Sequence, residues 1–77
     1  MNNSRRKDLR GIIDQIEELK GLLEDLMCEE EEFRDNIPEN LQGSERYEKS
    51  DAACNDMQDA LIYLDDAATC IEAAIGD

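Results

Sequence analysis

The sequence predicts an all-α protein, an antiparallel two-helix hairpin of the coiled-coil kind. Apolar residues recur at alternating steps of three and four in two long stretches, which is the spacing of a helical seam. The only proline and a run of turn-forming residues separate the two stretches, at residues 35–44. One Phe, two Tyr and no Trp leave an aliphatic core, which suits helix packing better than a sheet sandwich.

The first helix is expected at about residues 8–35. The preceding residues 1–7 carry Arg5, Arg6 and Lys7, cations placed where the dipole of a helix prefers acids. We therefore expect residues 1–7 to form a flexible basic arm. The predicted seam of this helix is Leu9, Ile12, Ile16, Leu19, Leu23, Leu26, Glu30, Phe33 and Ile37.

The hinge is expected at residues 36–44. Asn36 is a suitable C-terminal cap, and Pro38 cannot continue the helix. Ser44 is the predicted N-cap of the second helix, because Ser accepts hydrogen bonds from free amides at a helix start. Leu41 is the apolar residue that we expect to fold back over the end of the hairpin.

The second helix is expected at about residues 45–75, with Gly76 as its stop. Its predicted seam is Tyr47, Ser50, Cys54, Met57, Leu61, Leu64, Ala68, Ile71 and Ile75. Four further alanines recur every seven residues, a pattern that lets a neighbouring helix approach closely: Ala53, Ala60, Ala67 and Ala74. We call these four residues the alanine row.

The two seams pair best when the numbers of facing residues sum to about 80. In this register the two polar positions coincide, because Glu30 faces Ser50. One hairpin interface leaves part of the alanine row uncovered, together with four larger apolar residues: Ile13, Leu22, Met27 and Ile62. Since a hairpin this small seldom stands alone, we expect a homodimer that forms a four-helix bundle.

The net charge of -13 opposes direct binding to nucleic acid or to an anionic membrane, and it permits a basic protein partner. Between residues 14 and 32 there are nine acids and one cation, Lys20, and residues 51–77 hold seven acids and no cation. The bland interpretation is a solvated face that keeps a small bundle soluble. The functional one is a partner-binding acidic surface: Glu17, Glu18, Glu24, Asp25, Asp59, Asp65 and Asp66.

Nothing in the sequence predicts an enzyme. Histidine is absent, so no cysteine has a base to activate it, and the three cysteines form no CxxC pair. We expect Cys54 to be buried on the seam and Cys28 and Cys70 to be exposed, as reduced thiols in a cytoplasm. Neither EF-hand spacing nor a metal-binding Glu-x-x-His pair occurs, and we expect no metal and no cofactor.

The hinge end is the second candidate site. Ser44 begins a helix whose free amides can hold an anion, and cations lie close to it in the sequence. The residues that could bind a small nucleotide there are Arg34, Ser44, Arg46, Tyr47 and Lys49. The alternative is that they cap and brace the turn.

Residues 35–48 read Asp-Asn-Ile-Pro-Glu-Asn-Leu-Gln-Gly-Ser-Glu-Arg-Tyr-Glu, and an acidic helix rich in Ala, Asp and Leu follows. In this stretch the chain resembles small uncharacterised acidic helical-hairpin proteins of phages and prophages of Gram-positive, often gut-associated, bacteria. The resemblance implies a mobile-element setting in a bacterial host cytoplasm, where small non-enzymatic proteins counter host defence. The expected function is an inhibitor that binds a bacterial protein through the acidic surface. The alternatives are a sponge for a signalling nucleotide at the hinge, or a structural assembly module.

Overall fold

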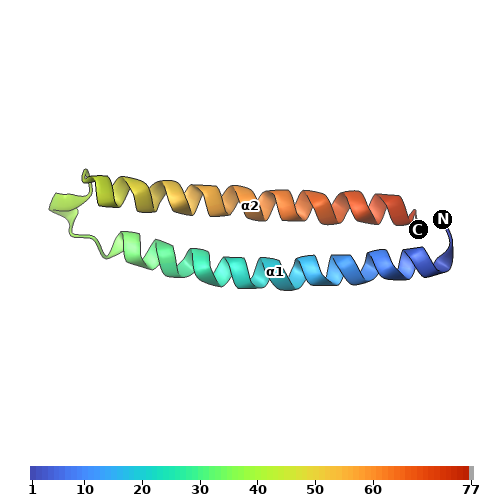
Figure 1. The fold of residues 1–77 in the computed structure, drawn as a ribbon. Helices are drawn as coiled ribbons and strands as arrows, with labels where there is room; N and C mark the ends of the chain where they lie inside the picture. The colour runs from blue at the N-terminus through green and yellow to red at the C-terminus, as the bar shows by residue number, and fades with distance from the viewer. Residues whose placement is uncertain (77) are drawn as a thin grey trace.

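The fold is a two-helix hairpin, seen in a computed structural model that describes residues 1–76. Helix α1 (Asn3–Asp35) and helix α2 (Glu45–Ile75) lie antiparallel, and the short 3-10 helix η1 (Glu39–Leu41) lies in the hinge between them (Figure 1). The rod measures 59 × 15 × 14 Å. The predicted hairpin is therefore confirmed. Within residues 1–76, neither helix has an apolar stretch that is long enough to cross a membrane.

Helix α1 begins at Asn3, so the predicted start near Asp8 was too late. The Asn2 side chain caps the helix, because its Oδ1 accepts the backbone N–H of Arg5 at 2.7 Å. The Arg6 Nε also donates to the backbone carbonyl oxygen of Ile75 at 3.1 Å. The expected basic arm is thus helical from Asn3 onward and is tied to the end of α2, which offsets its unfavourable position in the helix dipole.

The caps at the other helix ends agree with the sequence. Asn36 caps α1, and the Ser44 Oγ accepts the backbone N–H of Tyr47 at 3.3 Å to cap α2. Gly76 ends α2 at φ 74°, a left-handed conformation that glycine adopts without steric cost. The expectation for Leu41 was wrong: it is 50% exposed, and Ile37 is the buried residue of the hinge.

The seam of α2 is confirmed along its whole length. Five of its nine residues are buried: Ser50, Cys54, Leu61, Ala68 and Ile75. The other four are half-buried: Tyr47, Met57, Leu64 and Ile71. Contact with α1 therefore follows the predicted heptad positions of this helix from the hinge to the chain end.

The seam of α1 is rotated by one residue from the prediction. Leu9, Ile16, Leu23 and Glu30 face α2 as expected, and Ile37 is buried just beyond the end of α1. The second row of the observed seam consists of Ile13, Lys20, Met27 and Arg34, all half-buried. The four residues predicted there, Ile12, Leu19, Leu26 and Phe33, are 42% to 58% exposed, and we call them the α1 row.

Two ion pairs accompany the rotation. Lys20 and Arg34 reach acids on α2, and their side chains are only 15% and 20% exposed. Hydrophobic periodicity alone did not distinguish the predicted seam from the observed one, because apolar residues occupy adjacent rows on α1. Ile13 and Met27, expected to be uncovered, therefore lie half-buried, while Leu22 and Ile62 are exposed as predicted.

The register agrees with the sequence. The Ser50 hydroxyl donates a hydrogen bond to the Glu30 carboxylate, so the two polar positions of the seams face each other as predicted. This hydrogen bond matters because Ser50 is buried, and a buried hydroxyl without a partner would be destabilising.

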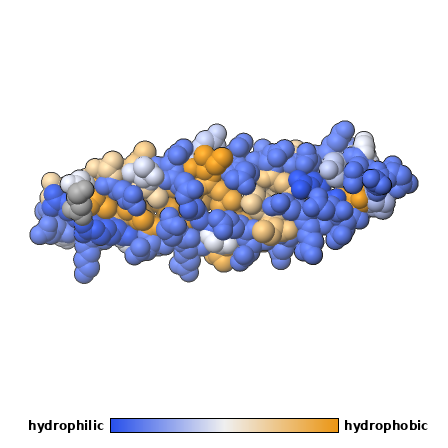
Figure 2. Space-filling view, turned by 180° about the vertical axis from the view of Figure 1, so that it is seen from behind, coloured by the Kyte–Doolittle hydropathy of each residue, from blue (hydrophilic) through white to orange (hydrophobic). Residues whose placement is uncertain are grey.

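The hairpin exposes more surface than its mass requires. Its accessible surface is 5623 Å², whereas a globular protein of 8.8 kDa has about 4,800 Å². Among the described residues, no large side chain is fully buried. Figure 2 shows one long side of the rod, where hydrophilic residues cover most of the surface and hydrophobic residues gather in a band along the middle. The core is thus one thin layer between two helices.

We expect Leu61→Ala to lower the free energy of unfolding by ~2–5 kcal/mol, because Leu61 is 6% exposed and its removal leaves a cavity in that layer. Denaturant titration followed by circular dichroism measures the loss. The control is Ile62→Ala, since Ile62 is 47% exposed and should change stability little. Equal losses in the two variants would contradict the seam described here.

Candidate functional site

Two ion pairs link the helices along one side of the seam. The Lys20 Nζ pairs with the Asp65 carboxylate and lies 3.5 Å from a carboxylate oxygen of Glu17. The Arg34 guanidinium donates to Asp51 Oδ1 and to Asp35 Oδ1, each at 3.0 Å. The hydrogen bond with Asp65 raises the pKa of Lys20 above its ordinary value. The sequence analysis missed both ion pairs between the helices. Their cations could have been found, because residues 13, 20, 27 and 34 recur every seven residues and so lie on one line along α1.

All seven residues of the predicted acidic surface are exposed. Glu17 and Asp65 are bound to Lys20. Within residues 1–76, the other five carboxylates form no ion pair and no hydrogen bond, and therefore face solvent with their charge uncompensated: Glu18, Glu24, Asp25, Asp59 and Asp66.

The seven acids of this surface, which we call the acidic body, surround the rod and do not form one patch. Glu17 and Glu24 share a line along α1 because they are seven residues apart, and Glu18 with Asp25 forms a second line ~100° away. Asp59 and Asp66 form a corresponding line on α2. The acidic body therefore presents negative charge in several directions, and a partner that wraps or cradles the rod would meet more of it than a flat one.

The hinge residues are largely occupied within the chain. Arg34 turns inward to its two carboxylates, and the Lys49 Nζ pairs with Glu45 Oε1 at 2.9 Å. Ser44 serves as the cap of α2, and Tyr47 is half-buried on the seam. These arrangements match the alternative in which the residues cap and brace the turn.

One groove remains at the hinge, with a volume of about 250 Å³. Of the five predicted hinge residues, only Ser44 and Arg46 line it. The Arg46 guanidinium lies over the Phe33 ring, 4.8 Å from the ring centroid, in a cation–π contact. The rest of the lining is largely apolar: Phe33, Asn36, Ile37, Pro38 and Leu41. Only one cation is therefore placed to meet an anionic ligand in this groove.

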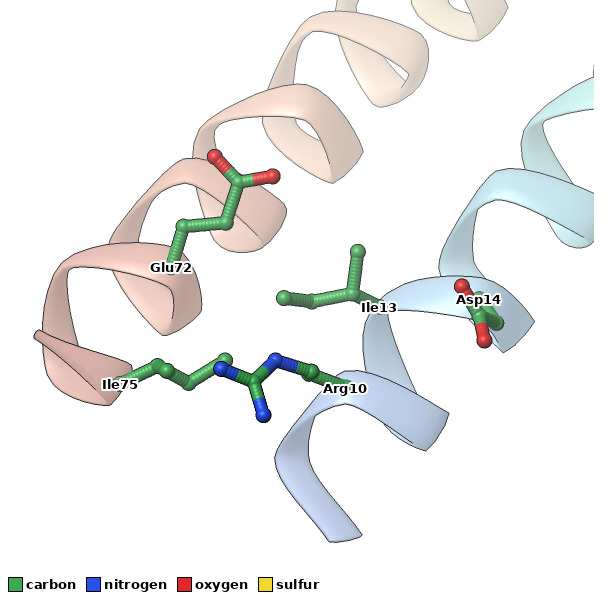
Figure 3. Close-up of a pocket in the computed structure, with 5 residues that line it drawn as sticks. All are labelled: Arg10, Ile13, Asp14, Glu72 and Ile75. Atoms are coloured by element: carbon green, nitrogen blue, oxygen red, sulfur yellow. The ribbon is translucent and has the colours of Figure 1, made fainter. Parts of the chain in front are cut away.

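A second groove, of about 380 Å³, lies at the opposite end of the rod. Arg10, Ile13 and Asp14 from α1 and Glu72 and Ile75 from α2 line it. Arg10 and Ile75 point toward each other, while Asp14 lies on the far side of α1 (Figure 3). The sequence analysis did not identify this groove, because it arises where the basic start of α1 meets the end of α2.

The cysteines are placed as predicted. Cys54 is buried, and Cys28 and Cys70 are exposed, all three as free thiols. Burial raises the pKa of the Cys54 thiol, which makes it a weak nucleophile at neutral pH. Within residues 1–76, no three His, Cys, Asp or Glu side chains are grouped to hold a metal ion.

No protein family, curated protein or solved structure matches this chain.

We expect stability to fall above about pH 9, in part because of Cys54. Its pKa is raised in the folded state above the ordinary value of 9.0, so its contribution is intact below pH 9 and is lost as the pH rises through the folded pKa. Denaturant titrations from pH 8 to pH 10 measure the slope, which should be shallower in Cys54→Ala. The exposed Cys28 provides the control. If Cys28→Ala reduces the pH dependence of stability as much as Cys54→Ala does, burial of the thiol is not the cause.

Proposed function

We propose that this chain is a non-enzymatic binding protein of a phage or mobile element, which inhibits a bacterial defence protein in the host cytoplasm. The observation that carries the proposal is the acidic body. Five of its carboxylates face solvent without an ion pair within residues 1–76. They lie on two helices that are joined by the ion pairs of Lys20 with Asp65 and of Arg34 with Asp51. Such a surface attracts a basic cleft on another protein.

Two physical features favour binding through this surface. Uncompensated charges steer a basic partner over distances of about a Debye length, which is ~8 Å at physiological salt. The carboxylates also lie on helices that are already formed, so binding does not have to order the backbone. The phage setting rests on the resemblance of residues 35–48.

We also propose that the working form is a homodimer, a four-helix bundle. The thin core and the exposed α1 row support this, since exposed apolar rows of this kind mark protein contacts. A dimer also leaves room for the third alternative, a structural assembly module, in which self-association itself is the function.

The nucleotide sponge remains the second candidate because of the groove of about 250 Å³ at the hinge. Arg46 is its only lining cation, and the Arg46 contact with Phe33 holds the guanidinium at the groove. Its weakness is charge. Arg34 and Lys49, which were expected to help bind phosphate, are paired with carboxylates.

We expect a charge-neutralised variant to lose its bacterial partner. The variant replaces the five unpaired acids of the body by their amides: Glu18→Gln, Glu24→Gln, Asp25→Asn, Asp59→Asn and Asp66→Asn. Affinity capture from a bacterial lysate should retain the partner with the wild type and lose it with the variant. Salt should weaken capture by the wild type, because ions screen exposed charges.

The matched control neutralises five exposed acids outside that surface: Asp8, Asp14, Glu32, Glu39 and Glu48. Retained capture by the control assigns binding to the acidic body. Equal loss in both variants would mean that net charge alone attracts the partner, and full retention in both would refute the acidic contact.

We expect isothermal titration calorimetry with cyclic nucleotides and ADP-ribose derivatives to show no heat. Binding to the wild type that disappears in Arg46→Ala would instead establish the hinge sponge. Arg46→Ala is the informative variant because Ser44→Ala would also remove a helix cap and cost ~1 kcal/mol of stability.

A further inference from the structure

We infer that the partner in the proposed dimer packs on one defined face, with the α1 row of each copy over the alanine row of the other. We call these two rows together the open face. It consists of Ile12, Leu19, Leu26 and Phe33 on α1, with Ala53, Ala60, Ala67 and Ala74 on α2. This inference rests on the dimer proposed above and adds its contact surface and its orientation.

The two rows lie on the same side of the hairpin. Arg46 lies seven residues before Ala53, on the line of the alanine row, and its guanidinium stacks on Phe33 of the α1 row. The ion pairs of Lys20 with Asp65 and of Arg34 with Asp51 occupy the other side of the seam. The open face is therefore the side without the ion pairs.

Each large residue of the α1 row is level with a small residue of α2. The Phe33–Arg46 contact sets the levels, and each step of seven residues preserves them in an antiparallel pair. Leu26 is thus level with Ala53, Leu19 with Ala60, and Ile12 with Ala67. The face consists of a ridge of large side chains beside a furrow of small ones.

A second copy of the same hairpin complements this relief. A two-fold axis parallel to the rod turns the ridge of one copy over the furrow of the other and leaves every residue at its own height. Leu19 of one copy then packs over Ala60 of the other, and the same contact forms a second time by symmetry. Every neighbouring pair of helices in the resulting bundle is antiparallel, and the two hinges lie at one end.

The area suits a stable dimer. One 59 by 15 Å side of the rod has a footprint of roughly 900 Å², and standard interfaces bury ~800 Å² per partner. The accessible surface of the chain, 5623 Å², exceeds the value expected of a globular monomer by about 800 Å². Covering the open face would remove an excess of this size.

The charges also suit a second copy. Copies of net charge -13 repel each other, and the open face carries no acid in either row, so close approach is least costly there. At its edge, Glu29 lies between Leu26 and Phe33, and Lys49 lies between Arg46 and Ala53. The two-fold axis brings Glu29 of one copy level with Lys49 of the other, whose ion pair with Glu45 of its own chain is exposed to solvent.

Exchange of large and small residues between two variants tests this packing. Leu19→Ala leaves a void over Ala60, and Ala60→Leu sets leucine against leucine, so each homodimer should dissociate at least about tenfold more readily than the wild type. In an equimolar mixture of the two variants, one contact places the new leucine over the new alanine and the other is native. Sedimentation equilibrium should show dissociation of the mixture within about threefold of the wild type.

Circular dichroism of each variant checks that the hairpin still forms, and the Leu26→Ala and Ala53→Leu pair repeats the exchange at the next level. Ile62→Ala is the control, because Ile62 is exposed but lies two residues, or ~200°, from Ala60. Its dimer should match the wild type. A wild-type dimer whose mixed variants are not rescued would overturn this face while leaving the dimer intact. A wild type that sediments as a monomer at 100 µM would overturn both.

Discussion

The ion pairs between α1 and α2 form only with the observed side of α1 facing inward, and the remaining surface follows from that orientation. Lys20 and Arg34 place their charged ends on Asp65 and Asp51, while their apolar stems lie along the seam. If α1 were turned by one position to bury Leu19 and Leu26, these two cations would leave their partners. The hairpin instead leaves an apolar row open, and its accessible surface is correspondingly large.

The accuracy of the sequence analysis differed between the helices for a physical reason. On α2, acids and alanines flank the seam, so only one row of larger apolar residues can face α1, and every seam residue was predicted correctly. On α1, apolar residues stand next to each other in two adjacent rows, as Ile12 and Ile13 do, and Leu26 and Met27. Hydrophobic spacing then allows two orientations, and the choice depends on cations whose partners are more than 15 residues away in the sequence.

The candidate sites show the same distinction between local and long-range information. Exposure of the acidic residues follows from their positions on the helices and was predicted correctly. The pairing of Arg34 with Asp51 depends on how the helices pack, so the hinge could not be recognised as a region of mostly compensated charge. The helical start of α1 combines both kinds of information: the Asn2 cap is local, whereas Arg6 reaches the carbonyl oxygen of Ile75 near the other end of the chain.

The proposed dimer contact and the proposed partner-binding surface occupy different parts of this molecule, and electrostatics would separate them further. Packing of two copies on the open face would leave Glu24, Asp59 and Asp66 on the outside of both copies, so the proposed dimer would double the charge presented to a basic partner. The same charge opposes the dimer, because the two acidic hairpins repel each other. Added salt screens both effects: it strengthens contact between copies and weakens attraction to a basic partner. Association that tightens with salt therefore belongs to the open face, and association that loosens with salt belongs to the acidic body.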